Sequence, residues 1–440
     1  MSLERIYKGM PRLAQSLALN LHGYKIKRRR FNSSYYRYLQ IYQGSDPSSV
    51  DIARLRLFMR EALAVPYWRE MFEKTGVCVA GDDPVAEIKK LPILEKKFVK
   101  NNIDLFVNKK HANAGYFLST SGTTGSPLRF PCTHDMENRQ WAVWTRYRSW
   151  HGISHNAWMG WFGGKMIMGA EQGGPPFWHV NFPMKQLMFS CYHLSPDTVV
   201  HYYNKIKSSK VSWLHGYPSQ LSLFARLIES KNLGPLPDVK IVTVGSESLS
   251  ESQRLIMQHV FGAPVRQHYG LAEGVANISE TVGGKLLCDQ DFCLTELVSN
   301  KNYGSNVKRI VGTNYNNFAF PLFRYDTGDL AVVAAGTDEI ISLDGRVEDY
   351  ISLKDGRKIG RLANVFSGMS TIIESQIHQV SLKLIKVNVV KGDDFGPADV
   401  ERIKRRIKDV VGDEVEVEVV FLDTIPRTKS GKLRFVVSDV

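Results

Sequence analysis

The sequence predicts an α/β protein with a large N-terminal domain of mostly parallel strands and helices, followed by a small α+β domain. Apolar runs alternate with helical patterns across residues 211–262, which is typical of parallel strands connected by helices. Beyond residue 345, two apolar strands on either side of a basic helix replace this pattern. A chain of 440 residues that is 43% hydrophobic can bury two cores. We expect the domains to be residues 1–345 and 346–440.

The individual elements follow from hydrophobic spacing. Apolar residues recur three and four positions apart between residues 51 and 72, which predicts one amphipathic helix that continues after Pro66. Pro92 removes a backbone donor, so its segment is predicted to be an extended link into another helix. The other predicted elements are strands at 211–219, 239–248, 381–390 and 415–422, and helices at 220–230, 249–262 and 398–412.

The chain is basic, with a formal net charge of +13. Such a charge suits ATP, an anionic membrane or nucleic acid, but no recognisable nucleic-acid-reading motif is present, so we expect no specific nucleic acid partner. The densest basic run, residues 25–30, is interpreted as a solvated face with aromatic side chains beneath it. The alternative is peripheral contact with anionic lipid headgroups or with an anionic glycan.

No uninterrupted apolar stretch of about 18 residues and no secretory signal is found. The expected location is the cytoplasm, or the inner face of the membrane if the basic run binds lipid. The five cysteines are scattered, which indicates reduced thiols. Cys288 and Cys293 lack a second Cys or His pair at the spacing of a zinc site, so no structural zinc is expected.

The strongest local signal is STSGTTGSP at residues 119–127. Its glycines allow a sharp turn that aims N–H groups inward, and its hydroxyls can donate to phosphate oxygens or hold Mg. The loop lacks the GK[ST] ending of a P-loop, so taken alone it is equally compatible with a surface turn.

Three further segments carry side chains suited to a nucleotide reaction. In QHYGLAEG, Tyr269 offers a flat face for a purine and Glu273 a carboxylate for a metal; a core tyrosine and a surface glutamate are the alternative. In FRYDTGDL, Asp329 can accept hydrogen bonds from a ribose or can act as a turn former. IPRTKSGKLR, residues 425–434, offers a mobile lysine to a transferring phosphoryl group, or else is a solvated basic tail.

Candidates for a ligand crevice lie where predicted strands end. They are His215, Tyr217, Gly245 and Ser246. WMGWFGGK, residues 158–165, combines aromatic walls with glycines, and Trp161, Phe162 and Gly163 either line an apolar acid pocket or pack in the core.

Together and in this order, these motifs resemble those of the adenylate-forming superfamily, which contains acyl-CoA synthetases, peptide-synthetase adenylation domains and luciferases. Residues 344–360, DGRVEDYISLKDGRKIG, resemble the hinge between that superfamily's large domain and its small mobile domain. The segments VPYWREMFEKTGV, LPILEKKFVKNN and LHGYPSQL are most similar to the phenylacetate-CoA ligase and CapK-like capsular-polysaccharide branch. The motifs extend from Ser119 to Arg434, so the resemblance covers most of the chain.

The resemblance implies ATP and Mg as cofactors and a role for each matching residue. Residues expected to bind the cofactor are Ser121, Gly122, Thr123, Thr124, Gly125, Ser246, Glu247, Tyr269, Asp329 and Arg346. Among them, Tyr269 would stack on adenine and Asp329 would bind the ribose. Glu273 and Thr123 would hold Mg and act with Lys432 in catalysis. Glu348 would be the hinge, and Tyr217 would line the acid pocket with Trp161, Phe162 and Gly163.

Two departures from the superfamily pattern are visible. Many members carry a lysine where this loop has Ser126, and Arg129 is the candidate substitute. The Cys and His residues that follow the Tyr and Glu motif in some phenylacetate-CoA ligases are absent from ISETVGGKLL, which weakens the case for phenylacetate as substrate.

The resemblance implies that a carboxylic acid attacks the α-phosphorus of ATP, releases pyrophosphate and becomes an acyl-adenylate. The small domain would then rotate and admit an acceptor. Two acceptors stay open: an amine or hydroxyl of a sugar or glycan, as in surface or capsular polysaccharide biosynthesis, or CoA, which would give a thioester.

Overall fold

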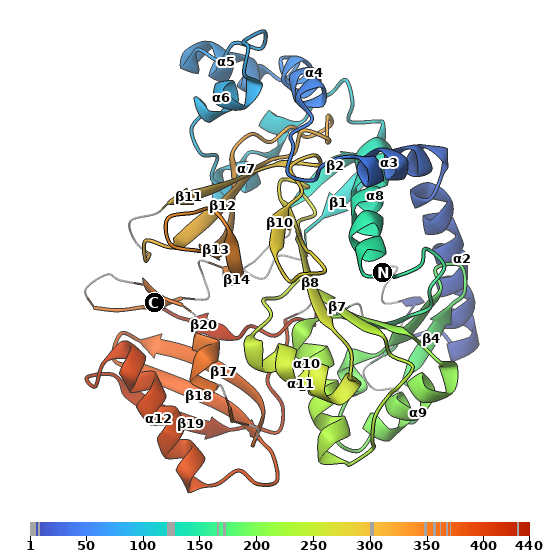
Figure 1. The fold of residues 1–440 in the computed structure, drawn as a ribbon, viewed down its shortest axis with the longest axis vertical. Coiled ribbons are helices and arrows are strands. Elements are labelled where there is room, and N and C mark those ends of the chain that lie inside the picture. Colours follow the sequence, from blue (N-terminus) through green and yellow to red (C-terminus); the bar gives the residue numbers. More distant parts are fainter. Residues whose placement is uncertain are drawn as a thin grey trace.

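A sheet of twelve strands forms the centre of the large N-terminal part of this computed structural model (Figure 1). The structure describes residues 6–7, 9–120, 128–164, 167–169, 173–299, 303–346, 350–354, 358–360, 362–366, 368–369, 371–428 and 431–440. In spatial order the strands are β11 (Leu294–Ser299), β12 (Val307–Thr313), β13 (Tyr325–Val333), β14 (Ile340–Arg346), β10 (Leu286–Cys288), β9 (Asn277–Glu280), β8 (Val265–Gly270), β7 (Ile241–Gly245), β6 (Trp213–Gly216), β3 (Met159–Phe162), β5 (Gln186–Phe189) and β4 (Trp178–Asn181).

The predicted α/β class is confirmed, but parallel pairing is limited to one section of the sheet. Strands β5, β3, β6, β7 and β8 are parallel neighbours, whereas the other neighbouring pairs of this sheet are antiparallel. Parallel pairing therefore ends at β5 on one side and at β8 on the other. The physical reason is the short connections there: tight turns such as the one at Gly283 and Gly284 can join only antiparallel strands.

Helices cover both faces of the parallel section. One face packs against α9 (Val199–Ser209), α10 (Pro218–Ser230) and α11 (Glu251–Phe261) in a single apolar core. The opposite face is covered by α8 (His134–Trp150), which in turn packs against α2 (Arg12–Arg30) and α3 (Ser33–Gly44). Because side chains alternate along a strand, Leu214 points to the first face and Trp213 to the second.

The predicted helix at residues 51–72 is divided into α4 (Ile52–Ala62) and α5 (Pro66–Thr75). Pro66 occupies the first turn of α5, where the missing N–H costs nothing, but it would break a continuous helix. Smaller elements of the large domain are α6 (Pro84–Lys89), α7 (Lys96–Asn101), η1 (Ile103–Phe106), η2 (Cys191–His193) and the two-stranded sheet of β1 (Gly115–Ser119) and β2 (Arg129–Thr133).

The C-terminal part has its own sheet and core, as expected for a small α+β domain. Strands β19 (Glu416–Phe421), β18 (Leu384–Lys391), β17 (Ile372–Ser381) and β20 (Val436–Ser438) lie in that order and pack on α12 (Pro397–Val411). The remaining elements are β15 (Ile351–Ser352), β16 (Lys358–Ile359) and η4 (Leu362–Phe366). Strand β14 ends at Arg346 and the second core begins at Ile351, while the division between residues 345 and 346 stays a prediction.

Candidate active site

A cavity of about 1270 Å³ lies between the large sheet, α8 and the small domain. Six of the residues predicted for the nucleotide and the reaction line it: Ser246, Glu247, Tyr269, Glu273, Asp329 and Lys432. Thr120 and Leu128, which flank the predicted phosphate loop, also face the cavity. Segments separated by some 300 positions in the sequence therefore meet at one site.

Tyr269 and Asp329 meet in this cavity through a direct hydrogen bond. The phenol of Tyr269, near the end of β8, donates to Oδ2 of Asp329 in β13 over 2.7 Å. Burial, with the neighbouring Asp329 carboxylate, raises the pKa of Tyr269 well above its usual value, so the phenol stays a neutral donor. An aromatic ring thus lies beside a carboxylate with acceptor capacity left, an arrangement suited to a base and its ribose.

Glu273 lies just beyond β8 and is 1% exposed. Its Oε1 accepts a hydrogen bond from Tyr325 over 3.3 Å and lies 3.9 Å from Nζ of Lys96. In the described part of the chain, no three or more His, Cys, Asp or Glu residues gather as metal ligands. One carboxylate is what Mg²⁺ requires when substrate phosphates and water supply its other ligands, so Glu273 fits that ion.

Lys432 reaches the large domain from a tight hairpin. Its backbone carbonyl accepts from the Thr428 N–H over 3.0 Å, and Gly431 has a positive φ of 75°. A Cβ on Gly431 would lie 2.8 Å from Cα of Gly164, so glycine is required by both the conformation and the close approach. The Lys432 ammonium lies 5.7 Å from the ring centroid of Tyr217.

Glu247 connects the two domains. Its Oε2 accepts the backbone N–H of Ser219, at the start of α10, over 3.1 Å, and its Oε1 accepts the N–H of Leu433 over 2.9 Å. Burial raises the pKa of Glu247, while these N–H groups stabilise the carboxylate and oppose that rise. Leu433 follows Lys432, so this carboxylate fixes the hairpin of Lys432 against the large domain.

Sequence reasoning missed the basic wall of the cavity. Lys96, Lys97 and Lys100 of α7 line it, together with Arg30, Arg226, Arg254 and Arg434. The available signal was the lysine spacing in LPILEKKFVKNN, which places three lysines within one turn and a half of a short helix. Arg129, the expected substitute for a loop lysine, is instead exposed on β2 with its guanidinium 4.8 Å from the Phe117 ring centroid, and it does not line the cavity.

Of the four residues expected to form the acid pocket, Trp161 and Phe162 lie on opposite faces of β3. Phe162 is 0% exposed and stacks with Phe189 and Phe224, so it belongs to the hydrophobic core. Trp161 is half-buried on the opposite face, and a Cβ on Gly163 would lie 2.1 Å from its ring. Neither Trp161 nor Gly163 lines the cavity, and their substrate role stays a prediction.

On the α8 side, the cavity is lined by residues that sequence reasoning did not select. Trp141 and Trp144, one turn apart on α8, face it together with His268 of β8. Burial and the charge of Arg148 lower the pKa of His268 to about 3, so this imidazole is neutral. Aromatic residues at this helical spacing normally indicate a core face, which is why the sequence alone did not mark them.

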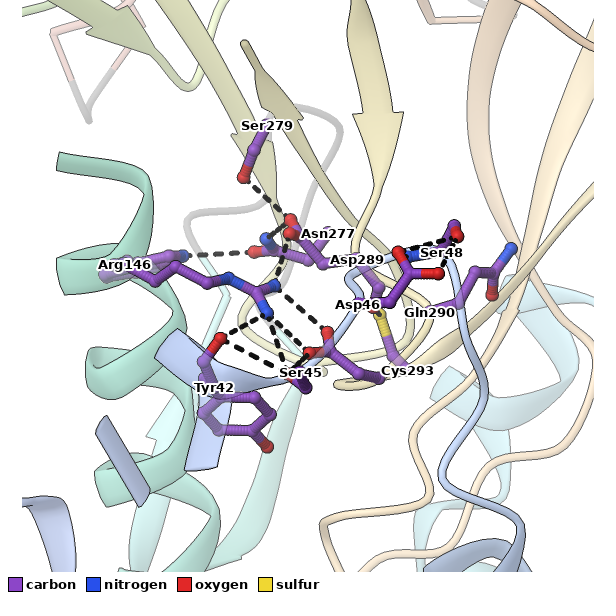
Figure 2. A network of polar contacts seen from close by, with 12 residues as sticks. Tyr42, Ser45, Asp46, Ser48, Arg146, Asn277, Ser279, Asp289, Gln290 and Cys293 are labelled. Carbon is purple, nitrogen blue, oxygen red and sulfur yellow. Dashed lines mark hydrogen bonds and ion pairs between the residues drawn. The ribbon is translucent and has the colours of Figure 1, made fainter. Parts of the chain in front are cut away.

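Figure 2 shows the buried network that holds α8 in place. The Arg146 guanidinium lies 2.7 Å from Oδ1 of Asp289 and 2.5 Å from Oδ2 of Asp291, and it donates to the Tyr42 carbonyl over 3.1 Å. Burial raises the pKa of Asp289 to about 6, and the charge of Arg146 opposes this rise. The network joins α8 to α3 and to the loop after β10, so the cavity-facing side of α8 has a fixed position.

Several predicted site residues lie outside the described residues. They are Ser121, Gly122, Thr123, Thr124 and Gly125 of the phosphate loop and Glu348 of the hinge. Arg346 ends β14, where its backbone pairs with Asp329. Their predicted roles are not tested by the geometry.

The fold is that of the adenylate-forming ligases. A 2-hydroxyisobutyryl-CoA ligase in the postadenylation state, in complex with 2-HIB-AMP, matches with a TM-score of 0.67 at 18% identity over 88% of each chain. The same ligase in the thioesterification state, in complex with 2-HIB-AMP and CoA, has a TM-score of 0.50 at 17% identity, covering 99% of this chain and 92% of the ligase. An anthranilate-CoA ligase in complex with anthranoyl-AMP has a TM-score of 0.52 at 14% identity. The match covers 72% of this chain and 65% of that ligase.

The comparisons also connect the chain with CapK. Residues 351–439 match the family model of the CapK C-terminal domain. Protein CapK of Staphylococcus aureus is 25% identical over 457 aligned positions, and the alignment covers 100% of both chains. The resemblance to adenylate-forming enzymes and to the CapK-like branch is thereby confirmed. Within the described ranges, no helix is both long and apolar enough to span a bilayer.

Proposed function

We propose that the protein is an ATP-dependent ligase that activates a carboxylic acid as an acyl-adenylate. The observation that carries this proposal is the meeting of Tyr269, Asp329, Glu273 and Lys432 in one cavity. The wall of lysines and arginines around them complements a polyphosphate. The higher TM-score with the postadenylation state than with the thioesterification state supports an arrangement of the small domain in which Lys432 faces the reaction.

In the proposed mechanism, the Tyr269 ring supports the adenine and Asp329 accepts hydrogen bonds from the ribose. A carboxylate oxygen of the acid attacks the α-phosphorus, the bond to the β-phosphate breaks and pyrophosphate leaves. Lys432 balances the negative charge that develops between the carboxylate and the α-phosphate. Glu273 would hold Mg, which supplies further charge neutralisation at the phosphates.

The next step needs the hairpin of Lys432 to leave. Rotation of the small domain about residues 346–349 would break the bond between Leu433 and Glu247 and open the site to an acceptor. The likeness to CapK supports a sugar or glycan amine or hydroxyl as acceptor, in surface polysaccharide biosynthesis. The alternative acceptor is CoA, which the fold shared with CoA ligases supports.

The test is pyrophosphate release over a panel of carboxylic acids with Mg-ATP, followed by product analysis with CoA and with amino sugars. Acid-dependent pyrophosphate release supports adenylation, and release with none of the acids contradicts it. A thioester that forms only with CoA would favour the second acceptor, whereas an amide or ester of the sugar would favour the first.

We also propose peripheral contact of α2 with an anionic lipid surface, at the inner membrane face. Helix α2 runs along the outer edge of the large domain beside β4 (Figure 1). Leu13, Leu17 and Leu21 are 87%, 63% and 64% exposed at four-residue spacing, which gives one apolar ridge along the helix. The helix has no acidic residue, and Lys25 and Arg28 are exposed at its C-terminal end. An apolar ridge beside exposed cations complements an anionic bilayer.

A further inference from the structure

Arg148 of α8 contacts the rings of two tryptophans. Its guanidinium carbon lies 4.9 Å from the ring centroid of Trp213 and 5.3 Å from that of Trp141. Within the part of the chain that the structure describes, no Asp or Glu forms an ion pair with it. The other half-buried or buried arginines of the same helix are paired: Arg146 with Asp289 and Asp291, and Arg139 with Asp135.

An unpaired cation at a half-buried site is energetically unfavourable. Desolvation of a charge costs several kcal/mol unless an opposite charge compensates it, and cation–π contact returns only about 0.5–2 kcal/mol. Burial lowers the pKa of Arg148 to about 10, so the side chain is still charged at neutral pH. An uncompensated positive charge at such a site favours the binding of an anion from solution.

Polar groups near Arg148 are joined through the Thr243 hydroxyl. Nε1–H of Trp213 donates to Oγ1 of Thr243 over 2.7 Å, and the Thr243 hydroxyl lies 2.8 Å from Nδ1 of His215. The Thr243 hydroxyl can donate to Nδ1 of a neutral His215 or accept from its Nδ1–H, because the oxygen has a second lone pair. Burial and the charge of Arg148 lower the pKa of His215 to about 3, so this imidazole is neutral.

Arg148 adjoins the proposed adenylation cavity only through its neighbours, since Arg148, Trp213 and His215 do not line it. Trp141, whose ring contacts Arg148, lines the cavity, as does His268, whose low pKa also reflects the charge of Arg148. Lys432 and Tyr269 line the same cavity from the other side. Arg148 is therefore separated by the Trp141 side chain from the cavity in which the reacting carboxylate would lie near Lys432.

We propose that the acid activated by this protein carries a second anionic group, which Arg148 binds between Trp141 and Trp213. This rests on the proposed adenylation and names its substrate class: dicarboxylic acids, or carboxylic acids with a phosphonate or sulfonate at the far end. The shared chemistry is an anion that accepts a forked pair of hydrogen bonds from a guanidinium. Arg148 thus determines specificity, while the reacting carboxylate stays with Lys432.

The experiment compares matched acids in two variants. Pyrophosphate release is measured with butyrate, valerate and hexanoate, with succinate, glutarate and adipate, and with phosphono and sulfo analogues of equal length. The wild-type protein is expected to favour acids with an anionic tail by roughly 10²-fold or more in kcat/KM. The reason is that a neutral analogue leaves the Arg148 guanidinium unpaired in the complex. Arg148→Met, which keeps the apolar stem, should abolish the preference and retain turnover of monocarboxylates. Arg405→Met on exposed α12 is the matched control.

A second measurement separates this inference from the proposed function. Calorimetric binding of the same acids, without turnover, should show that the wild type binds the doubly anionic acids and Arg148→Met does not. Equal binding and equal preference in both proteins would overturn the role of Arg148, even if adenylation occurs. Arg148-dependent binding without acid-dependent pyrophosphate release would support the anion site and overturn the proposed adenylation.

Discussion

The backbone N–H of Leu433 donates to Oε1 of Glu247 over 2.9 Å, and this bond joins the hairpin of Lys432 to the large domain. The other carboxylate oxygen accepts from Ser219 at the start of α10, where helix N–H groups favour negative charge. One carboxylate therefore connects the position of Lys432 to the large domain, which carries the proposed nucleotide-binding residues. The bond would have to break before an acceptor could enter, so Glu247 couples the two proposed half-reactions.

Replacement of Glu247 by Gln should weaken docking of the hairpin. The amide of Gln accepts through only one oxygen, so one of the two N–H bonds to Ser219 and Leu433 is lost. Hydrogen bonds to a charged group contribute about 1.5–3 kcal/mol, which corresponds to a decrease of roughly 10- to 100-fold in ATP–pyrophosphate exchange. Glu418→Gln on exposed β19 is the control. An unchanged exchange rate in Glu247→Gln would contradict the coupling.

Lys432→Ala should lose adenylation by roughly 10²–10³, the usual effect of removing one electrostatic group from a transition state. The measurement is carboxylate-dependent ATP–pyrophosphate exchange. Transfer from a supplied acyl-adenylate should be retained, because Lys432 is assigned only to the first half-reaction. Lys383→Ala, at an exposed position of the small domain, controls for general effects on that domain. Exchange at the wild-type rate would remove Lys432 from the mechanism.

Stability should decrease as the pH falls below about 6.5, because two imidazoles are held neutral. Burial, with the charge of Arg148, lowers the pKa of His215 and of His268 to about 3 from the usual 6.5. Between those values the unfolded chain binds protons that the folded chain does not, so the free energy of unfolding falls with pH. Each imidazole lowers the free energy of unfolding by at most about 1.4 kcal/mol per pH unit, and it has no effect above about pH 7.

Urea unfolding at pH 7.5 and 5.5 measures this effect. His268→Gln should reduce the difference in unfolding free energy between the two pH values, whereas His259→Gln, at a 77% exposed position, should leave it unchanged. Arg148→Met should also reduce the difference, since its charge helps to keep both imidazoles neutral. The same pH dependence in wild type and His268→Gln would contradict the assignment.

The sequence predicts which motif residues meet in the cavity better than it predicts the other residues that line it. Tyr269, Glu273, Asp329 and Lys432 lie in short motifs whose order along the chain carries the information, and all four line one cavity. Trp141 and Arg148 have no such signal, because their proximity to β6 and β8 arises from the packing of α8. Helical spacing alone indicates a buried face without saying what that face contacts.

The same limit explains the errors in the fold. Alternation along β3 puts Trp161 and Phe162 on opposite faces, but only the positions of α8 and α10 decide which face is core. The antiparallel pairing after β8 was missed because the composition of a single strand does not show the direction of its neighbours. Their tight turns, rather than their composition, determine the direction of pairing.

The exposed ridge of α2 yields the last prediction. Leu17→Glu together with Leu21→Glu should abolish sedimentation with vesicles of phosphatidylserine and phosphatidylcholine, because a charge on the apolar face prevents its insertion among the acyl chains. Lys25→Gln with Arg28→Gln should weaken binding by about 1 kcal/mol per removed charge and reduce its salt dependence. Leu382→Glu, at a partly exposed leucine of the small domain, is the control. If the α2 variants bind as the wild type does, lipid is not the partner of this ridge; if they instead convert a dimer to a monomer, a second copy of the chain covers it.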